Sequence, residues 1–311
     1  MIQLINPNRN FDFLGKSRPF VVASTLLAVL SIVLIFTKGL NYGIDFTGGA
    51  EVQVKVPQDW DIGKLRSELE AGGIKEPTVV HIGDQNSHEY LLKIQSQPEN
   101  LNQVSSQIES ILSKKIDPKT FEISRVDVVG PQAGESLRTS AILSIFYAAL
   151  GILIYISFRF DIKYAPGVVR ALLVDVVITL GIWVLLQKEF NLTVLAGLLT
   201  LAGYSCNDTI VIYDRIRDYS KMNPSWSIEQ AINRSINQNL GRTFITVICT
   251  LFVVVSIWLL GGSVLGDFGL TLLIGMVISV FSTIFVANPM VLYMEKRRLA
   301  KAKLRLNGAR A

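Results

Sequence analysis

Cysteine and histidine are scarce in this chain, which has two of each among its 311 residues. Both cysteines, Cys206 and Cys249, lie in long apolar stretches, whereas His81 and His88 lie in the one long hydrophilic segment. The hydrophilic segment therefore has no thiol for a disulfide framework, and we expect the chain to hold no metal and no cofactor. A proton path through the apolar part would have to use carboxylates, arginine, hydroxyl groups and water.

Charged residues are also few: they make up 18% of the chain, against 50% hydrophobic residues, and the mean hydropathy is +0.41. This composition is too apolar for an ordinary soluble domain and predicts an integral membrane protein. Six apolar stretches are long enough to cross a bilayer: Pro19–Thr37, Ser140–Phe158, Val168–Leu186, Asn191–Tyr213, Phe244–Leu260 and Phe268–Tyr293. One large hydrophilic segment remains, from Asn41 to Thr139.

Positive residues predict the orientation of these spans. Lysines and arginines flank them on one side, namely Arg9, Lys16, Arg18, Arg159, Lys163, Arg215, Arg217, Lys221, Lys296, Arg297 and Arg298. Both termini are therefore predicted to face the cytoplasm, with the hydrophilic segment on the other side. The same residues explain the net charge of +5, so no nucleic-acid partner is predicted. The first stretch is longer than a signal-peptide core and lacks a small-x-small cleavage site, so we expect it to stay attached.

The pattern of residues 41–139 changes in the order strand, helix, strand, strand, helix, strand. The β-rich runs are Glu51–Val56, Thr78–Ile82, Tyr90–Ile94 and Phe121–Val128, with a hairpin expected at 83–87 and an irregularity at Ser124-Arg125. Helical spacing covers 62–69 and 101–112. This order predicts a ferredoxin-like α+β domain, an antiparallel sheet with two helices on one face. Because that fold hosts many functions and no nucleophile with a base is evident, a binding or mechanical module is favoured over an enzyme.

A glycine-rich motif follows the first span directly. Its sequence is Tyr42-Gly43-Ile44-Asp45-Phe46-Thr47-Gly48-Gly49. Such spacing of glycines suggests positive φ angles or close packing at the membrane exit. Composition alone would leave this motif as a connector.

The fourth stretch is about 35 Å long at about 1.5 Å per residue, yet its middle is polar, with Asn207, Asp208 and Thr209 in succession. A carboxylate inside a membrane span is costly, so function is sought first at Asp208. Asp208 lies about 26 Å from the outer face, and Arg242 opens the fifth span from the cytoplasmic face, so their depths suit a pair. Two alternatives stay open: Asp208 only hydrogen-bonds neighbouring helices, and Arg242 only extends to the inner interface.

Asp175 is a second intramembrane carboxylate, about 13 Å into the third span. It either belongs to a transport path or bonds Arg170 or a neighbouring helix. Small residues form stripes on two spans: Gly197, Thr200, Gly203 and Asn207 on the fourth, and Gly275, Ser279, Ser282 and Ala287 on the sixth. Close helix packing explains these stripes, and their polar members also suit a water path.

Residues 214–242 link the fourth and fifth spans. Ser227 and Gln230 have the spacing of a capping box, and apolar residues follow on one helical face: Ile228, Ala231, Ile232, Ile236 and Leu240. We expect an amphipathic helix that lies along the inner membrane surface as a passive link.

Several segments together resemble the SecF family of the bacterial Sec protein-export machinery. They are the membrane-exit motif, residues 203–217 around Asp208, Asn237-Gln238-Asn239-Leu240-Gly241-Arg242-Thr243, Leu272-Leu273-Ile274-Gly275 and residues 282–287. The resemblance covers nearly the whole chain. The chain departs from the family at Val174-Asp175, where the family often has His-Asp, and at Cys206, where an apolar residue is commoner.

The resemblance implies a fold and partners. The fold would be six transmembrane helices, half of a resistance-nodulation-division (RND) type set, with the ferredoxin-like domain between the first two. The domains would be a cytoplasmic N-terminus 1–18, helix 19–40, periplasmic domain 41–139, helices 140–295 and basic tail 296–311. The implied partners are SecD, the SecYEG translocon, YajC, the translocating unfolded polypeptide and the lipid bilayer, at the bacterial inner membrane. Proton transport through Asp208 and Arg242 would assist late export.

Three other functions compete with this interpretation. An RND-like exporter of lipids or small hydrophobic molecules would need a substrate tunnel through the outer domain. An intramembrane aspartyl protease would need Asp175 and Asp208 facing each other, and the Gly-x-Gly-Asp pattern of such enzymes is absent around both. In a scaffold, the membrane charges would only specify helix pairing.

Overall fold

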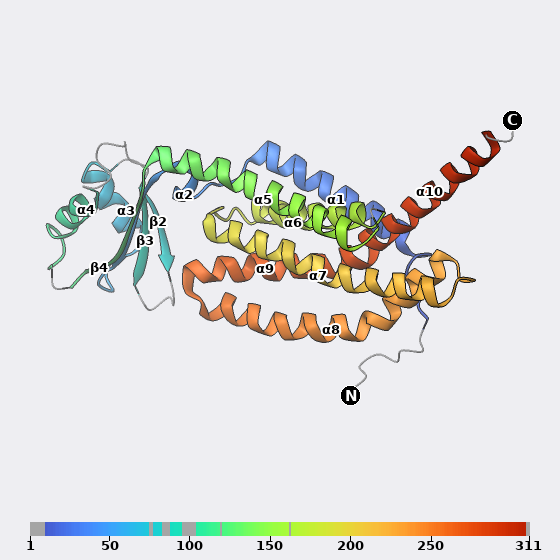
Figure 1. The fold of residues 1–311 in the computed structure, drawn as a ribbon. Coiled ribbons are helices and arrows are strands. Elements are labelled where there is room, and N and C mark those ends of the chain that lie inside the picture. Colours follow the sequence, from blue (N-terminus) through green and yellow to red (C-terminus); the bar gives the residue numbers. More distant parts are fainter. Residues whose placement is uncertain are drawn as a thin grey trace.

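The structure is a computed structural model, and it describes residues 10–74, 77–82, 88–94, 104–118, 120–161 and 163–308, without the side chains of 263, 264 and 302–308. A bundle of long helices carries a small α+β domain at one end, and the C-terminal helix projects from the other end (Figure 1). Within the described residues, six helical segments are long and apolar enough to cross a membrane. The chain is therefore a multi-pass membrane protein, as its composition predicts.

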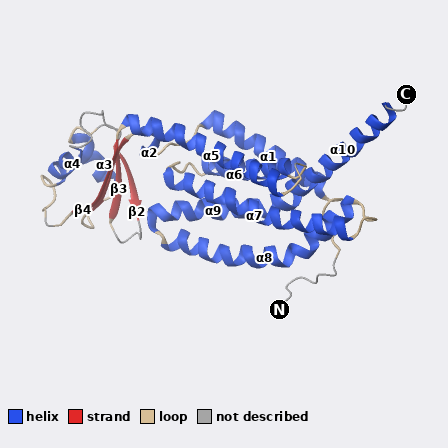
Figure 2. Cartoon of the chain, in the orientation of Figure 1, coloured by secondary structure: helices blue, strands red, loops and turns tan. Residues whose placement is uncertain are grey.

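The outer domain contains β1 (Gly49–Lys55), α3 (Ile62–Ala71), β2 (Thr78–Ile82), β3 (Glu89–Ile94), α4 (Val104–Leu112) and β4 (Glu122–Val129). The sheet order is β2-β3-β1-β4 and every neighbouring pair is antiparallel, which confirms the ferredoxin-like prediction. Figure 2 shows the sheet between α3 and α4 on one side and the bundle on the other. The expected hairpin at 83–87 and Leu101 lie outside the described residues.

The sheet has one apolar and one polar face because its residues alternate. Val52, Leu92, Leu65 and Ile108 are fully buried between the sheet and its two helices. The irregularity expected at Ser124-Arg125 is confirmed as a register shift, since Gln53 pairs with Arg125 and Val54 with Ile123. Ser124 is thus the extra residue of a bulge.

The membrane helices form two layers of different burial. They are α1 (Ser17–Lys38), α5 (Pro131–Arg159), α6 (Ala165–Leu185), α7 (Leu192–Met222), α8 (Ile228–Leu260), and α9 (Gly262–Ser282) continued by a π-helical turn, η2 (Thr283–Ala287), and α10 (Asn288–Gly308). Within the most apolar 18 residues of each helix, 61% of the residues are buried in α6, against 6% in α1 and 17% in α8. The central helices are α6, α7 and α9, and the outer ones expose apolar faces suited to lipid or to other membrane helices.

Close helix contacts occur where small residues lie. A methyl group added at Gly275 would meet Leu201, one added at Gly197 would meet Thr271, and one added at Gly181 would meet Ser31 of α1. The predicted stripe on the sixth span is buried, whereas Thr200, Gly203 and Asn207 of the fourth-span stripe are exposed. Only part of that stripe therefore packs within this chain.

The structure differs from the sequence prediction at several helix ends. Residues 131–139, expected in the outer domain, are the first turns of α5, because Pro131 opens the helix. Residues 228–242, expected as a separate link on the membrane surface, continue unbroken into the fifth span. The capping box at Ser227 and Gln230 is confirmed. The link is therefore not a separate helix, and its apolar side chains Ile232 and Ile236 pack in the protein core.

The segment before α1 is bound to the start of α8. Asn237 receives the backbone N–H of Phe11 at 2.9 Å and donates to its carbonyl at 2.9 Å. Asn233 accepts from the N–H groups of Phe13 and Leu14 and donates to Asp12. The N–H of Gly15 and the Asn233 amide also hold the pKa of Asp12 below its ordinary value. These bonds explain why the polar face of residues 228–240 is rich in asparagine.

Candidate functional site

Asp175 lies at the centre of the bundle, where α6, α7 and α9 meet. Its side chain is 0% exposed, and the Ser205 hydroxyl donates to its Oδ2 at 2.6 Å. The hydroxyl groups of Ser279 and Ser282 on α9 also lie near this carboxyl. Its other oxygen, Oδ1, is buried and has no hydrogen-bond partner among the described residues. The polar groups recorded around Asp175 are thus hydroxyl groups. Of the two bonds expected as alternatives to a transport role, the structure shows the one to a neighbouring helix, whereas Arg170 bonds Thr25 and Met290 instead.

Further hydroxyl groups follow Asp175 and its serine neighbours toward the C-terminal end of the bundle. We call this row of buried polar groups the buried seam. The hydroxyl groups of Thr209 and Thr283 lie 3.2 Å apart, and the Tyr213 hydroxyl donates to the carbonyl of Ala287 at 3.1 Å. The Asn288 amide donates to the carbonyl of Thr283 at 2.7 Å. These carbonyls lie in the π-helical turn η2, whose bonding pattern frees backbone groups for side-chain partners.

Asp208 lies one turn beyond Ser205 on α7 and has different surroundings. It is half-buried, and the opposite charge of Arg242 on α8 acts on it without an ion-pair contact. Arg242 itself is exposed, as is Asn207. Asp208 therefore opens onto an uncovered polar face of α7 and α8.

The predicted site residues thus fall into two groups. Thr209 and Asp175 belong to the buried seam, whereas Asp208, Asn207 and Arg242 belong to the open face. The structure records no interaction between the carboxyl groups of Asp175 and Asp208, which does not fit a protease dyad. Nor do the described residues contain a cluster of three or more His, Cys, Asp or Glu side chains that could hold a metal.

The membrane-exit motif forms a junction instead of a simple connector. The N–H of Gly43 donates to the carbonyl of Phe190 at 2.9 Å, and the N–H of Phe190 donates to Asn41 at 2.7 Å. Asp45 accepts from the N–H of Leu192 at 2.9 Å, so it caps α7 together with Asn191. Phe46 stacks on Phe190 with ring centroids 5.3 Å apart.

The two final glycines of the motif are needed for its path. Gly48 and Gly49 have φ angles of +75° and +149°, which side chains rarely adopt. A methyl group on Gly48 would lie 2.8 Å from the Cα atom of Pro131, and one on Gly49 would lie 2.8 Å from the carbonyl of Ile94. The motif is a short turn, α2 (Ile44–Thr47), wedged between the outer domain, α5 and α7.

Comparison with known proteins identifies this architecture. Residues 108–297 match the family described as "Protein export membrane protein SecD/SecF, C-terminal", and residues 33–58 match the "SecD/SecF GG Motif". The protein translocase subunit SecF of Calditerrivibrio nitroreducens is 42% identical over 96% of this chain and 98% of its own length. The chain belongs to the SecF family. The SecF subunit of Magnetococcus marinus is also 42% identical, over 92% of each chain.

A solved structure agrees with this membership. The crystal structure of SecDF from Thermus thermophilus, titled a translocon-associated membrane protein, matches with a TM-score of 0.82 and 34% identity over 93% of this chain. This chain covers 39% of the length of that SecDF chain. The family places the chain in Sec protein export, and its curated relatives are named as translocase subunits, which is a transport role.

Three features of these sites are absent from the sequence prediction. They are the Ser205–Asp175 hydrogen bond, the π-helical turn and an ion pair between Lys93 of β3 and Glu189 of the α6–α7 loop. The polar residues that interrupt the fourth apolar stretch, among which Ser205 lies, were a signal for the first. The other two join segments that no local pattern connects.

Proposed function

We propose that this SecF-family chain works with SecD to use the proton motive force in late steps of protein export through SecYEG. The outer domain would face the periplasm and handle the emerging unfolded polypeptide, and both termini would lie in the cytoplasm. YajC is a further proposed partner. The matched SecDF chain supports a SecD partner, because more than half of its length lies outside the part that this chain covers.

The observation that carries the proposal is the uncovered polar face of α7 and α8. Thr200, Gly203 and Asn207 are exposed on α7, and Arg242 is exposed on α8. Lipid tails offer no hydrogen bonds to such groups, so polar residues at this depth normally face another helix or a water-filled path. Membrane helices of SecD would complete this site.

Asp208 and Arg242 are suited to loading and releasing a proton at such an interface. Arginine keeps its charge, whereas a carboxylate changes charge when it binds a proton. Because the two groups interact at longer range than an ion pair, a small change in their separation or in hydration alters how well the negative charge is stabilised. Movement of SecD against α7 and α8 would produce such changes.

Asp175 would then be a second, internal proton-binding group. Its Oδ1 has no hydrogen-bond partner among the described residues, so this oxygen is free to carry a proton. Thr209 lies on the same seam, one turn from Ser205. We assign both residues to the proposed proton pathway.

The decisive experiment compares Asp208→Asn with wild type in an export assay with and without a proton gradient, at equal membrane abundance and equal co-purified SecD. Asp214→Asn is the matched control, because Asp214 lies on the same helix and pairs with Arg159 near its end. We expect Asp208→Asn to lose the gradient-dependent part of export and Asp214→Asn to keep it. An unchanged gradient response in Asp208→Asn would show that the proposed mechanism is wrong.

A further inference from the structure

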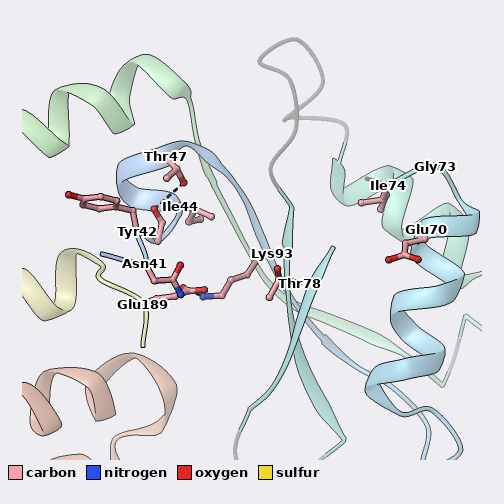
Figure 3. Close-up of a pocket in the computed structure, with 11 residues that line it drawn as sticks. Asn41, Tyr42, Ile44, Thr47, Glu70, Gly73, Ile74, Thr78, Lys93 and Glu189 are labelled. Carbon is pink, nitrogen blue, oxygen red and sulfur yellow. Dashed lines mark hydrogen bonds and ion pairs between the residues drawn. The ribbon is translucent and has the colours of Figure 1, made fainter. Parts of the chain in front are cut away.

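A crevice separates the polar face of the outer-domain sheet from the membrane bundle. Its volume is about 940 Å³, and it is lined on one side by outer-domain residues and on the other by the membrane-exit motif and the α6–α7 loop. In Figure 3, Lys93 of β3 and Glu189 of the α6–α7 loop point toward each other across this space. Among the described residues, theirs is the one ion pair that joins the outer domain to the bundle.

The chain crosses between the two bodies at a single place. It enters the sheet at Gly49 and leaves at Val129, and these two residues are ladder partners. Gly48 and Pro131, which flank the crossings on the bundle side, are in contact. A pair of adjacent crossings permits rotation about the line through them unless another contact opposes it.

Lys93 lies away from that line. It pairs across the β1–β3 ladder with Glu51, two residues along β1 from Gly49, so it is displaced from that line along the strands by about two residue rises of ~3.4 Å. A contact at this distance opposes rotation, because it holds the free side of the sheet against the bundle.

Lys93 has two carboxylate partners from different bodies. It lies 3.3 Å from Glu51, its neighbour across the β1–β3 ladder, and it also pairs with Glu189. The side chains of Lys93, Glu51 and Glu189 are only 18%, 22% and 24% exposed, so solvent screens them less than ordinary surface pairs. When the crevice opens, Glu51 can keep Lys93 satisfied while Glu189 is released.

We propose that Lys93 is a positioning residue that latches the outer domain to the membrane bundle through Glu189, with Glu51 holding the lysine when the latch opens. The latch sets the angle between the outer domain and the bundle. This inference rests on the proposed function only for its use in export, because the latch itself is a property of the chain alone.

The latch is tested on the full chain in lipid nanodiscs by distance measurement between two spin labels. Cys206 and Cys249 are first replaced by alanine, and labels are attached at Arg66→Cys on α3 and Leu265→Cys on α9, both exposed positions. Wild type should give one dominant distance. Lys93→Gln and Glu189→Gln should each shift the closed-to-open ratio about fivefold toward open, which corresponds to roughly 1 kcal/mol.

Two further variants separate the latch from general damage. The exchange Lys93→Glu with Glu189→Lys, made together with Glu51→Gln so that no carboxylate faces the new glutamate, should restore the wild-type distance, because it recreates the pair. Lys55→Gln is the matched control, since Lys55 is a lysine on the same sheet face whose partner, Glu89, belongs to the outer domain. Unchanged distances in Lys93→Gln, or failure of the exchange to restore a shifted distance, would overturn the proposal. Neither SecD nor a proton gradient is present, so this test stands apart from that of the export mechanism.

The response to pH offers a second test. Burial raises the pKa of Glu51, Lys93 acts in the opposite direction, and the negative charges of Glu189 and Asp127 add to the increase. The other charges nearby are paired, Arg125 with Asp127 and Lys188 with Asp267. If opening returns Glu51 to water, the closed form binds its proton more tightly than the open form, so acid favours the closed form and rising pH favours the open form. Wild type should therefore close as pH falls through the range above the ordinary glutamate pKa, and Glu51→Gln should lose this response; a response retained in Glu51→Gln contradicts the assignment of Glu51.

Discussion

Asp175 and Asp208 are carboxylates on neighbouring membrane helices, α6 and α7, yet they differ in burial and in charged neighbours. Asp175 is fully buried among hydroxyl groups of its own chain, whereas Asp208 is half-buried beside an open face with the charge of Arg242 in reach. When a side chain is buried inside one chain, its replacement changes the free energy of unfolding of that chain. Polar groups exposed at membrane depth instead need another helix or a water-filled path beside them, and we propose that SecD supplies it here.

The strongest way to break this comparison is to place the same cation at both positions. Asp175→Lys puts an unpaired charge in the bundle core and should destabilise the isolated chain by about 3–5 kcal/mol or prevent its folding. Asp208→Lys should change stability by no more than about 1 kcal/mol, because its side chain can reach the open face. Thermal unfolding of both variants in detergent decides between these outcomes, and equal loss of stability would remove the distinction.

A milder test adds a methyl group at a glycine in a buried helix contact and at an exposed glycine. At Gly167 it would lie 2.3 Å from the Tyr213 hydroxyl and 2.8 Å from the carbonyl of Ala287, whereas nothing lies within 4 Å at Gly203. Gly167→Ala should cost about 1–3 kcal/mol, since a backbone carbonyl has to move. Gly203→Ala should stabilise the isolated chain by up to about 1 kcal/mol, because alanine favours the helix. Denaturation of the purified chain measures both, and the reverse order of stabilities would contradict the structure.

The hydrogen bond to Asp175 can be removed by itself. Ser205→Ala removes the hydroxyl that donates to Oδ2 of Asp175 and should cost about 1–2 kcal/mol. Ser256→Ala is the control, because the Ser256 hydroxyl is exposed and bonds only the carbonyl of Phe252 on its own helix. If thermal unfolding of the two variants is the same, the Ser205 bond adds nothing to the stability of the buried site.

The two native cysteines provide the mildest test. Cys206 is buried, whereas Cys249 is exposed two turns beyond Arg242 on α8. A lipid-soluble thiol reagent should label Cys249 and not Cys206 in the chain alone, and added SecD should slow the labelling of Cys249. Unchanged labelling of Cys249 in the presence of bound SecD would place the partner elsewhere.

Much of the fold could be predicted from local patterns. Apolar runs located the membrane helices, and alternation located the strands and even the bulge at Ser124, because both patterns repeat over a few residues. Helix ends were less predictable: α5 starts at Pro131, and α8 runs without a break from Ile228. No proline separates its amphipathic start from its apolar span, and the one glycine there, Gly241, costs a helix only about 1 kcal/mol. The apolar side of that start fits protein as well as it fits a membrane surface.

The sequence indicated which polar residues lie within the spans, but not which of them contact one another. Spacing along the chain gave a depth for Asp175 and Asp208 within their spans, but depth does not give the rotation of a helix about its axis. Only the packing of α6 against α7 brings Ser205 to Asp175 and leaves Asp208 toward α8. The Lys93–Glu189 pair joins residues 96 positions apart, and no local pattern indicates it.

The paired crossings at Gly49 and Val129 also have a consequence for how the molecule is built. The two ends of the segment 49–129 are ladder partners on adjacent strands. The segment therefore joins the bundle at two adjacent points, as a single hairpin would. The distance between α2 and α5 is then independent of the size of the insertion. The bundle can therefore carry a larger, smaller or different outer module at this point without any change in the arrangement of its helices.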